Sequence, residues 1–298
     1  MYPAPFRYHR PPTLSSAIAL LAELGEGARP LAGGQSLIPI LKMRMDEPSD
    51  LVDINRLPEL LHIDNHVDEV VIGALATHAR IAGSAVTARI PIIGDCASGI
   101  ADPQVRTLGT IGGSLSVADP SSDWPALLQV LKTKVVCQGP AGTRNIAIGD
   151  FITDSYTTAL ADGELVTEVR IEVPPPNSGG AYIGFKKAAP SYPAAAAGVQ
   201  LTLADGDVCQ NIRVVLGAAG PVPVISAEVE RQLEGQSLSD DKLAQAADVL
   251  VELSDPPADA RGSANFKRAI LRSLFVKAAK TAIQRAGGEN IIGSHDYV

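Results

Sequence analysis

Two segments of the sequence place glycine beside small hydroxyl or amide residues. The first loop is Leu31-Ala32-Gly33-Gly34-Gln35-Ser36-Leu37-Ile38, and the second loop is Thr107-Leu108-Gly109-Thr110-Ile111-Gly112-Gly113-Ser114-Leu115. Glycine lets a backbone turn sharply, so that successive N–H groups can point at one ligand oxygen. One such loop is most often only a turn. Two in one chain favour two contacts with one elongated, phosphate-bearing cofactor.

Flavin adenine dinucleotide (FAD) meets the requirements of such a pair of loops. Its pyrophosphate needs backbone N–H donors, its ribityl chain needs small hydroxyl-sized hydrogen-bonding partners, and its ring needs an apolar slot. Neither loop matches Gly-x-Gly-x-x-Gly, and the P-loop pattern is also absent, so the sequence does not predict those nucleotide sites. The residues expected to form the apolar slot are Leu31, Ile38, Ile100, Leu108 and Val166.

The second loop leads into the segment Asp119-Pro120-Ser121-Ser122-Asp123. We expect this segment to cap a helix that contains Trp124, Leu127, Leu128 and Leu131. The two aspartates suit both capping and contact with a ligand, and the sequence leaves both roles open.

The composition is that of a globular protein with an aliphatic core. Of 298 residues, 46% are hydrophobic but only 4% are aromatic, and the length allows two ordinary domains. The net charge of −8, without long basic runs, argues against nucleic acid or an anionic membrane as a partner. Pro, Gly or charge interrupts every apolar stretch before about 18 residues, so we expect no membrane span. The N-terminus does not resemble a cleaved signal, and the expected location is cytoplasmic.

Cysteine and histidine do not indicate a metal site or a catalytic group. Cys96, Cys137 and Cys209 are far apart and lack the close pairing of zinc or iron–sulfur ligands, so each is expected to be a small buried hydrophobe. The histidines are scattered and expected to lie near neither loop, and we assign none of them a catalytic role: His9, His62, His66, His78 and His295.

Strands and helices are expected to alternate in the first half of the chain. After an extended segment at residues 5–10, Thr13 caps a helix that Gly25 stops, and a strand at Arg29–Ala32 runs into the first loop. Ser36 is expected to cap the next helix. Further strands are expected at residues 51–54, 61–63, 70–73, 134–137 and 165–171, with a turn at Asp64-Asn65 and helices that begin at Thr77 and Pro91.

The clearest linker is Pro174-Pro175-Pro176-Asn177-Ser178-Gly179-Gly180, because prolines and glycines break both strands and helices. We therefore expect an FAD-binding domain at residues 1–176, with subdomains at about 1–56 and 57–176, and a C-terminal α+β domain at 177–298. Strands are expected there at residues 181–187, 198–204 and 211–217, with a hairpin turn at Asp205-Gly206 and two helices at 240–253 and 263–286.

Four segments, in this order and spacing, closely resemble the FAD-binding medium subunit of molybdenum hydroxylases: residues 32–37, 106–114, 119–123 and 185–187. That family includes the medium chain of aerobic carbon monoxide dehydrogenase and the flavin domain of xanthine dehydrogenase. The resemblance covers nearly the whole chain. It implies an α+β, two-subdomain FAD-binding fold of the vanillyl-alcohol oxidase and p-cresol methylhydroxylase type, followed by a small C-terminal α+β domain.

The resemblance also implies a set of cofactor contacts. The first loop would wrap the pyrophosphate and ribityl region, the second would line the other side, and Lys186 would stabilise a reduced, anionic flavin. The alternative is that Lys186 is an ordinary strand lysine. The implied FAD contacts are Leu31, Ala32, Gly33, Gly34, Gln35, Ser36, Leu37, Ile38, Ile100, Gly109, Thr110, Gly113, Ser114, Val117, Ser122, Asp123, Val166, Lys186 and Tyr192.

One segment departs from the family pattern. Many bacterial members have Gly-Asp before a tyrosine beside the isoalloxazine ring, whereas this chain has Ala189-Pro190-Ser191-Tyr192-Pro193. The tyrosine is retained, but the two prolines are expected to stiffen the loop and alter its approach. Whether Tyr192 covers the ring is therefore left open. The chain also lacks the clustered cysteines of members that carry an iron–sulfur insertion.

The function implied by the resemblance is electron transfer. Hydroxylation would occur on a large molybdopterin-binding subunit, and electrons would pass through a small subunit with [2Fe-2S] clusters to the FAD of this chain. An external acceptor such as a quinone, NAD or oxygen would then take them. The expected assembly is a dimer of heterotrimers, and neither the hydroxylated substrate nor the acceptor can be read from the sequence.

Two alternatives remain at this point. The first is a self-sufficient flavoprotein oxidoreductase of the same fold, although no catalytic base or covalent-flavin histidine is evident near the loops. The second is a regulatory nucleotide-binding module without redox function.

Overall fold

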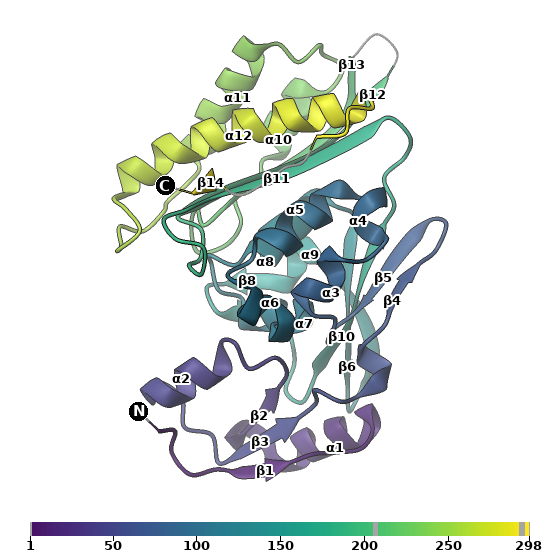
Figure 1. The fold of residues 1–298 in the computed structure, drawn as a ribbon, viewed down its shortest axis with the longest axis vertical. Helices are drawn as coiled ribbons and strands as arrows, with labels where there is room; N and C mark the ends of the chain where they lie inside the picture. Colours follow the sequence, from purple (N-terminus) through teal and green to yellow (C-terminus); the bar gives the residue numbers. More distant parts are fainter. Residues whose placement is uncertain (1, 205–207, 292–295, 298) are drawn as a thin grey trace.

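The structure, a computed structural model, describes residues 2–204 and 208–291, together with the backbone of residues 296–297. Three parts follow one another along the long axis of the molecule (Figure 1). A small N-terminal part lies at one end, a central part of helices and strands lies in the middle, and the C-terminal part lies at the other end. Among the described residues, no helix is both long and apolar enough to cross a membrane.

The N-terminal part is a three-stranded parallel sheet in the order β1-β3-β2, with α1 packed on it. The helix begins where predicted, because Thr13 and Ser16 form a capping box, and it ends at Gly25, which has a positive φ (63°). Its elements are β1 (Arg7–His9), α1 (Leu14–Leu24), β2 (Ala28–Leu31), α2 (Leu37–Met43) and β3 (Asp50–Asp53).

Two local predictions in this region need correction. Ser36 does occupy the N-cap position of α2, but it lies in a helical conformation and its side chain makes no capping hydrogen bond. Asp64 and Asn65 are not a turn, because they belong to strand β4 (Ile63–Asn65), which pairs with β5 (Glu69–Gly73). Their partners Val70 and Val71 on the buried strand set this extended conformation, which residue type alone does not reveal.

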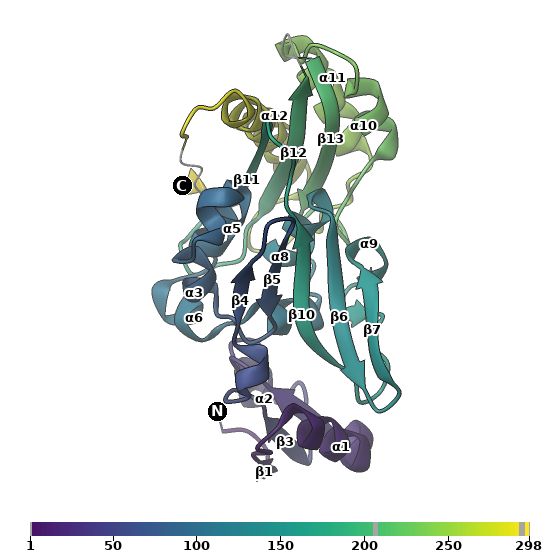
Figure 2. The ribbon, with the colours of Figure 1, turned by 90° about the vertical axis from the view of Figure 1, so that its right-hand side faces the viewer.

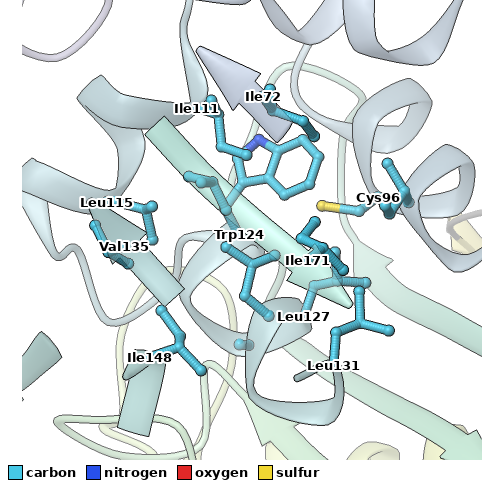
Figure 3. Close-up of a cluster of buried hydrophobic side chains, with 14 of the residues drawn as sticks. Ile72, Cys96, Ile111, Leu115, Trp124, Leu127, Leu131, Val135, Ile148 and Ile171 are labelled. Atoms are coloured by element: carbon cyan, nitrogen blue, oxygen red, sulfur yellow. The ribbon is translucent and has the colours of Figure 1, made fainter. Parts of the chain in front are cut away.

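The central part contains a five-stranded antiparallel sheet in the order β4-β5-β10-β6-β7, covered by short helices on one face (Figure 2). The fully buried Trp124 lies in the hydrophobic core between sheet and helices, near Ile72, Ile111 and Cys96 (Figure 3). The remaining elements are α3 (His78–Ala82), α4 (Val86–Arg89), α5 (Pro91–Gly99), α6 (Pro103–Leu108), α7 (Ile111–Val117), α8 (Asp123–Leu127), β6 (Thr133–Gly139), β7 (Gly142–Ala147), α9 (Ile148–Phe151), β8 (Ile152–Asp154), β9 (Thr157–Thr158) and β10 (Leu165–Glu172).

Helix α8, which follows the segment at residues 119–123, begins differently from the prediction. Ser122 occupies the cap position of α8 without a capping side-chain bond, and Asp123 is the first helical residue. The carboxylate of Asp119 instead accepts a hydrogen bond from the N–H of Ser121 at 2.8 Å, within its own turn. Asp123 lies at the positive end of the helix dipole, where a carboxylate is favoured.

The C-terminal part is an antiparallel sheet backed by helices, as expected, with a short parallel strand added at its edge. The sequence predicted two helices and missed α10. The predicted turn at Asp205-Gly206 lies outside the described residues, although the strands that flank it are paired. The elements are β11 (Ser178–Lys186), β12 (Ala195–Ala204), β13 (Val208–Gly217), α10 (Ala227–Leu233), α11 (Asp240–Glu252), α12 (Ala264–Ala286) and β14 (Asp296–Tyr297).

The glycines of the predicted linker are not loop residues. Gly179 and Gly180 lie inside β11, and a Cβ added to Gly179 would come within 2.0 Å of the Ala282 carbonyl oxygen on α12. Glycine is therefore required there by the close approach of a helix, rather than by chain flexibility. The domain boundary at 176/177 stays a prediction.

The central and C-terminal parts share a hydrophobic core and a buried ion pair. Tyr182, Ala196 and Val215 from the C-terminal sheet belong to the same buried cluster as Trp124. On the nearby surface of α12, Arg285 forms a two-pronged ion pair with Asp95 of α5, at 2.7 and 2.9 Å, with both side chains almost fully buried. These contacts fix how the C-terminal part sits on the central part.

Candidate functional site

One cavity of about 410 Å³ brings the predicted site together. Every residue of the predicted set lines it except Leu31 and Ile38. These two side chains lie behind the first loop, where both would contact a Cβ built on Gly34. Leu108 is 56% exposed and does not line the cavity, so the expected apolar slot keeps only Ile100 and Val166. The role of the lining residues in binding FAD stays a prediction.

The first loop offers a run of free backbone donors. Within the described chain, no hydrogen bond uses the N–H groups of Gly33, Gly34, Gln35 or Ser36. Gly34 is left-handed (φ 70°), a conformation that bends successive N–H groups toward one side. All four residues line the cavity. Consecutive free N–H groups of this kind suit the oxygens of a phosphate or pyrophosphate.

The second loop differs, because its N–H groups already have acceptors inside the protein. Ile111 and Gly112 donate to the carbonyl oxygens of Ala76 and Ala74, while Gly113 and Ser114 donate to the hydroxyl and carbonyl oxygens of Thr110. The prediction that this loop points its N–H groups at the ligand is therefore wrong for residues 111–114. The second loop contributes a wall to the cavity and the hydroxyl of Ser114, which lies 3.5 Å from that of Ser122.

The two loops are in direct backbone contact. A Cβ on Gly33 would lie 2.1 Å from the carbonyl oxygen of Leu108 and 2.9 Å from Cα of Gly109. A side chain on Gly112 would likewise meet Ala74 at 2.5 Å. These contacts show that Gly33 and Gly112 are needed so that backbones can meet, whereas Gly34 is needed for its positive φ.

Buried charges lie at one side of the cavity. Lys186 on β11 is fully buried and donates to the Gly99 carbonyl oxygen at 2.5 Å, with its Nζ 3.9 Å from the Asp123 carboxylate. Burial lowers the pKa of Lys186, and the negative charge of Asp123 opposes that shift. Asp123 also accepts a hydrogen bond from the Tyr182 hydroxyl at 3.2 Å. The ammonium group and the carboxylate thus compensate each other beside the ligand space.

His78 lies in the cavity wall, contrary to the expectation that no histidine is near a loop. Its backbone N–H donates to the Gly109 carbonyl oxygen at 3.0 Å, and the residue is only 5% exposed. Burial lowers the pKa of His78 to about 4, with Asp123 raising it and Arg106 lowering it further. His78 is therefore neutral at pH 7. The other described histidines do not line the cavity, and His295 lies outside the described residues.

Tyr192 lies at the mouth of the cavity, in the loop between β11 and β12. Burial and the charge of Asp119 raise the pKa of its hydroxyl, while hydrogen bonding with Ser36 and Ser122 acts in the opposite direction. Arg261 steadies the same loop by donating to the Pro193 carbonyl oxygen at 3.3 Å. The tyrosine hydroxyl therefore lies between the first loop and the residues that follow the second.

Sequence reasoning missed several lining residues. Most belong to strands and helices that carry no motif, and only their folded positions bring them to the cavity. Among the described residues, those lining the cavity that were not predicted are Arg29, Pro30, Ile54, Ala74, Leu75, His78, Ala101, Val105, Gly112, Ser116, Leu165, Pro190 and Ser191. No group of three or more His, Cys, Asp or Glu residues in the described part of the chain is arranged to hold a metal ion.

The fold places one cavity between an N-terminal loop, a central helical wall and a C-terminal strand, and the free N–H groups of the first loop suit a phosphate-bearing ligand. Comparison with protein families narrows this class of ligand. Residues 4–175 match the family described as the FAD binding domain in molybdopterin dehydrogenase, and residues 180–282 match the CO dehydrogenase flavoprotein C-terminal domain. The chain belongs to the FAD-binding medium subunits of the molybdenum hydroxylase family.

Known relatives agree over almost the full length. The chain is 40% identical to the carbon monoxide dehydrogenase medium chain of Afipia carboxidovorans, over 96% of this chain and 99% of that one. It is 34% identical to the 6-hydroxypseudooxynicotine dehydrogenase complex subunit alpha of Paenarthrobacter nicotinovorans, over 96% and 97%. A chain of the crystal structure of Cu,Mo-CO dehydrogenase superposes with a TM-score of 0.92, at 39% identity, over 96% of this chain and all of that chain.

Proposed function

We propose that this chain is the FAD-carrying electron-transfer subunit of a multi-subunit molybdenum hydroxylase. The observation that carries the proposal is the convergence of the first loop's free N–H groups, the second loop and the buried Lys186 on one cavity. That convergence occurs in a chain whose family is FAD-binding. When bound, FAD supplies the redox chemistry, which the protein orients and tunes.

The residues of this chain fit such a ligand by their chemistry. The free donors of Gly33 to Ser36 suit pyrophosphate oxygens, and Ile100 and Val166 provide apolar walls. Lys186 holds a positive charge at the edge of the cavity, which favours added negative charge there. No nucleophile or acid–base pair is needed for this role. We also propose that the FAD-binding domain ends at residue 176.

The partners follow from the names of the relatives, which are medium chains or lettered subunits of complexes. We propose a small [2Fe-2S] subunit as the electron donor and a large molybdopterin-binding subunit as the site of hydroxylation, assembled as a dimer of heterotrimers. A cytoplasmic location is proposed because all three cysteines are free and buried. The relatives are named for different substrates, so similarity at this level does not select the substrate of this complex.

Purification of the tagged full-length chain from its native host tests the function. The expected result is a yellow protein whose flavin absorbance is bleached by dithionite and restored by air, accompanied by an iron–sulfur subunit and a molybdenum-containing subunit. A flavin-loaded chain that turns over a substrate alone, never with partners, would support the self-sufficient flavoprotein instead. Binding of adenine nucleotides without any reversible bleaching would indicate the regulatory module.

Replacing Lys186 by methionine tests the electrostatic part of the proposal. Without the ammonium group, the negative charge of Asp123 is no longer compensated, so reduction of the bound FAD becomes less favourable by about 1–2 kcal/mol. For two electrons this lowers the midpoint potential by roughly 20–40 mV. Redox titration of the flavin band measures this midpoint potential. Lys187→Met is the matched control, because Lys187 is exposed and bonds only to the Ala260 carbonyl oxygen. Equal potentials in the two variants would show that Lys186 does not act on the flavin.

A further inference from the structure

We propose that His78 is a further cofactor-positioning residue of the cavity, that its Nε2–H donates a hydrogen bond to FAD, and that Trp124 holds the imidazole in the tautomer that makes this possible. The inference rests on the proposed FAD site. It goes beyond that site's two loops, because His78 belongs to neither of them.

The tautomer of His78 follows from its partner. The Nε1–H of Trp124 donates to Nδ1 of His78 at 3.0 Å. An indole nitrogen can only donate, so Nδ1 must be the unprotonated acceptor, and in the neutral imidazole the proton lies on Nε2. Trp124 is fully buried in the core cluster that contains Ile72, Ile111 and Leu127, which leaves the indole little freedom to move (Figure 3).

The Nε2–H of His78 has no acceptor among the described residues, and the residue as a whole is only 5% exposed. In the described chain, Thr133 Oγ1 is the one fully buried side-chain polar atom without a partner, so the unbonded Nε2 of His78 keeps some open surface, where a ligand or water can accept its hydrogen bond. The ring edge that carries Nε2 faces away from the Trp124 contact, beside Gly109, and both His78 and Gly109 line the cavity. The unused donor therefore faces the ligand space.

Gly109 keeps this donor open. A Cβ built on Gly109 would lie 2.8 Å from Nε2 and 3.0 Å from Cδ2 of His78, so that even alanine would cover the nitrogen. The backbone of Gly109 is not left-handed, since its φ is −62°. The absence of a side chain at this position thus serves the approach to His78 rather than an unusual turn.

The charge state of His78 suits a hydrogen bond without added charge. Burial lowers the pKa of the His78 imidazole most strongly, Asp123 raises that pKa and Arg106 lowers it, and the imidazole is therefore neutral at pH 7. Arg29, Asp123 and Lys186 are charged residues of the cavity lining, whereas His78 provides a single fixed neutral donor. The matching ligand atom is an oxygen or nitrogen acceptor of FAD.

Two variants separate the ligand bond from the structural one. His78→Asn keeps an acceptor near the position of Nδ1 for Trp124 but removes the donor at Nε2, whereas His78→Gln can place an amide N–H near the position of Nε2. We expect His78→Asn to raise the dissociation constant for FAD by roughly tenfold, the usual effect of one lost hydrogen bond, and His78→Gln to recover part of it. Fluorescence titration of the apo full-length chain with FAD measures both.

A measurement on the unmodified chain makes the test independent of how the variants fold. In ¹⁵N-histidine NMR spectra, one Nε2–H proton should appear in the apo protein and shift when FAD is added, and Trp124→Phe should weaken or move that signal. An unmoved Nε2–H signal, or a His78→Asn variant with wild-type affinity, overturns the inference while the wild type still binds FAD. If the wild type does not bind FAD at all, the proposed function itself is wrong.

Discussion

Gly33→Ala abolishes retention of FAD during purification. The new Cβ would lie 2.1 Å from the carbonyl oxygen of Leu108 and 2.9 Å from Cα of Gly109, and both of these atoms belong to backbone that cannot rotate away. The first loop must therefore separate from the second, which moves the free N–H groups of residues 33–36 off the cavity wall. We expect a loss of about 3 kcal/mol in FAD binding, a factor of roughly 150 in affinity. The flavin-to-protein absorbance ratio after gel filtration measures it.

The other glycines supply graded controls for this variant. Gly113→Ala should retain more FAD, because its Cβ would meet no backbone atom: the nearest atoms are the side-chain oxygen of Thr110 at 2.8 Å, which can rotate, and Cβ of Ala32 at 3.9 Å. Gly149→Ala, distant from the loops and with its nearest contact at 3.9 Å, should retain FAD fully. A Gly33→Ala protein with the same flavin content as Gly149→Ala would falsify the claim that backbone contact between the loops holds the site together.

Arg285→Ala is expected to lower the free energy of unfolding by about 3–5 kcal/mol, since it leaves the carboxylate of Asp95 buried without its cation. The guanidinium also donates to the carbonyl oxygens of Gly180 and Ile291, so that three attachments of the end of α12 are lost together. Urea unfolding followed by circular dichroism measures the change.

Arg272→Ala on the same helix is the matched control. Its pair with Asp248 is exposed on both sides, and such surface pairs contribute only about 0–1 kcal/mol. The double variant Asp95→Leu with Arg285→Leu should recover part of the loss, because removing both charges leaves no uncompensated ion. Equal unfolding energies for Arg285→Ala and Arg272→Ala would show that the buried pair does not join the two parts of the molecule.

Local signals in the sequence predicted those parts of the fold that local chemistry determines. The caps at Thr13 and Thr77 accept the expected backbone N–H groups, and Gly25 ends its helix with a positive φ. The hydrophobic patterns located most strands to within a few residues. Both glycine loops do line the cavity, because each is positioned by an element that directly precedes or follows it.

The sequence failed where contacts between distant segments determine the outcome. Thr77 pairs with Thr110 in an isolated bridge, and this pairing carries His78 to the second loop. The acceptors that use the N–H groups of Ile111 and Gly112 come from Ala76 and Ala74, on another part of the chain. The sequence predicts Gly179 to be part of a linker, because its contact partner on α12 follows about a hundred positions later. None of these pairings leaves a pattern in a single sequence.

The hydrophobic cluster that unites Trp124 with Tyr182, Ala196 and Val215 bears on how such chains can be recombined. The two matched family domains meet between residues 175 and 180, yet one hydrophobic core continues across that boundary. A chimera joined at that point would pack the central part of one protein against the C-terminal part of another, whose side chains are not complementary to it. It would also replace Lys186 with the corresponding residue of the other protein. The useful unit of exchange between relatives is therefore the whole medium chain, or a C-terminal segment transferred with the residues around Trp124.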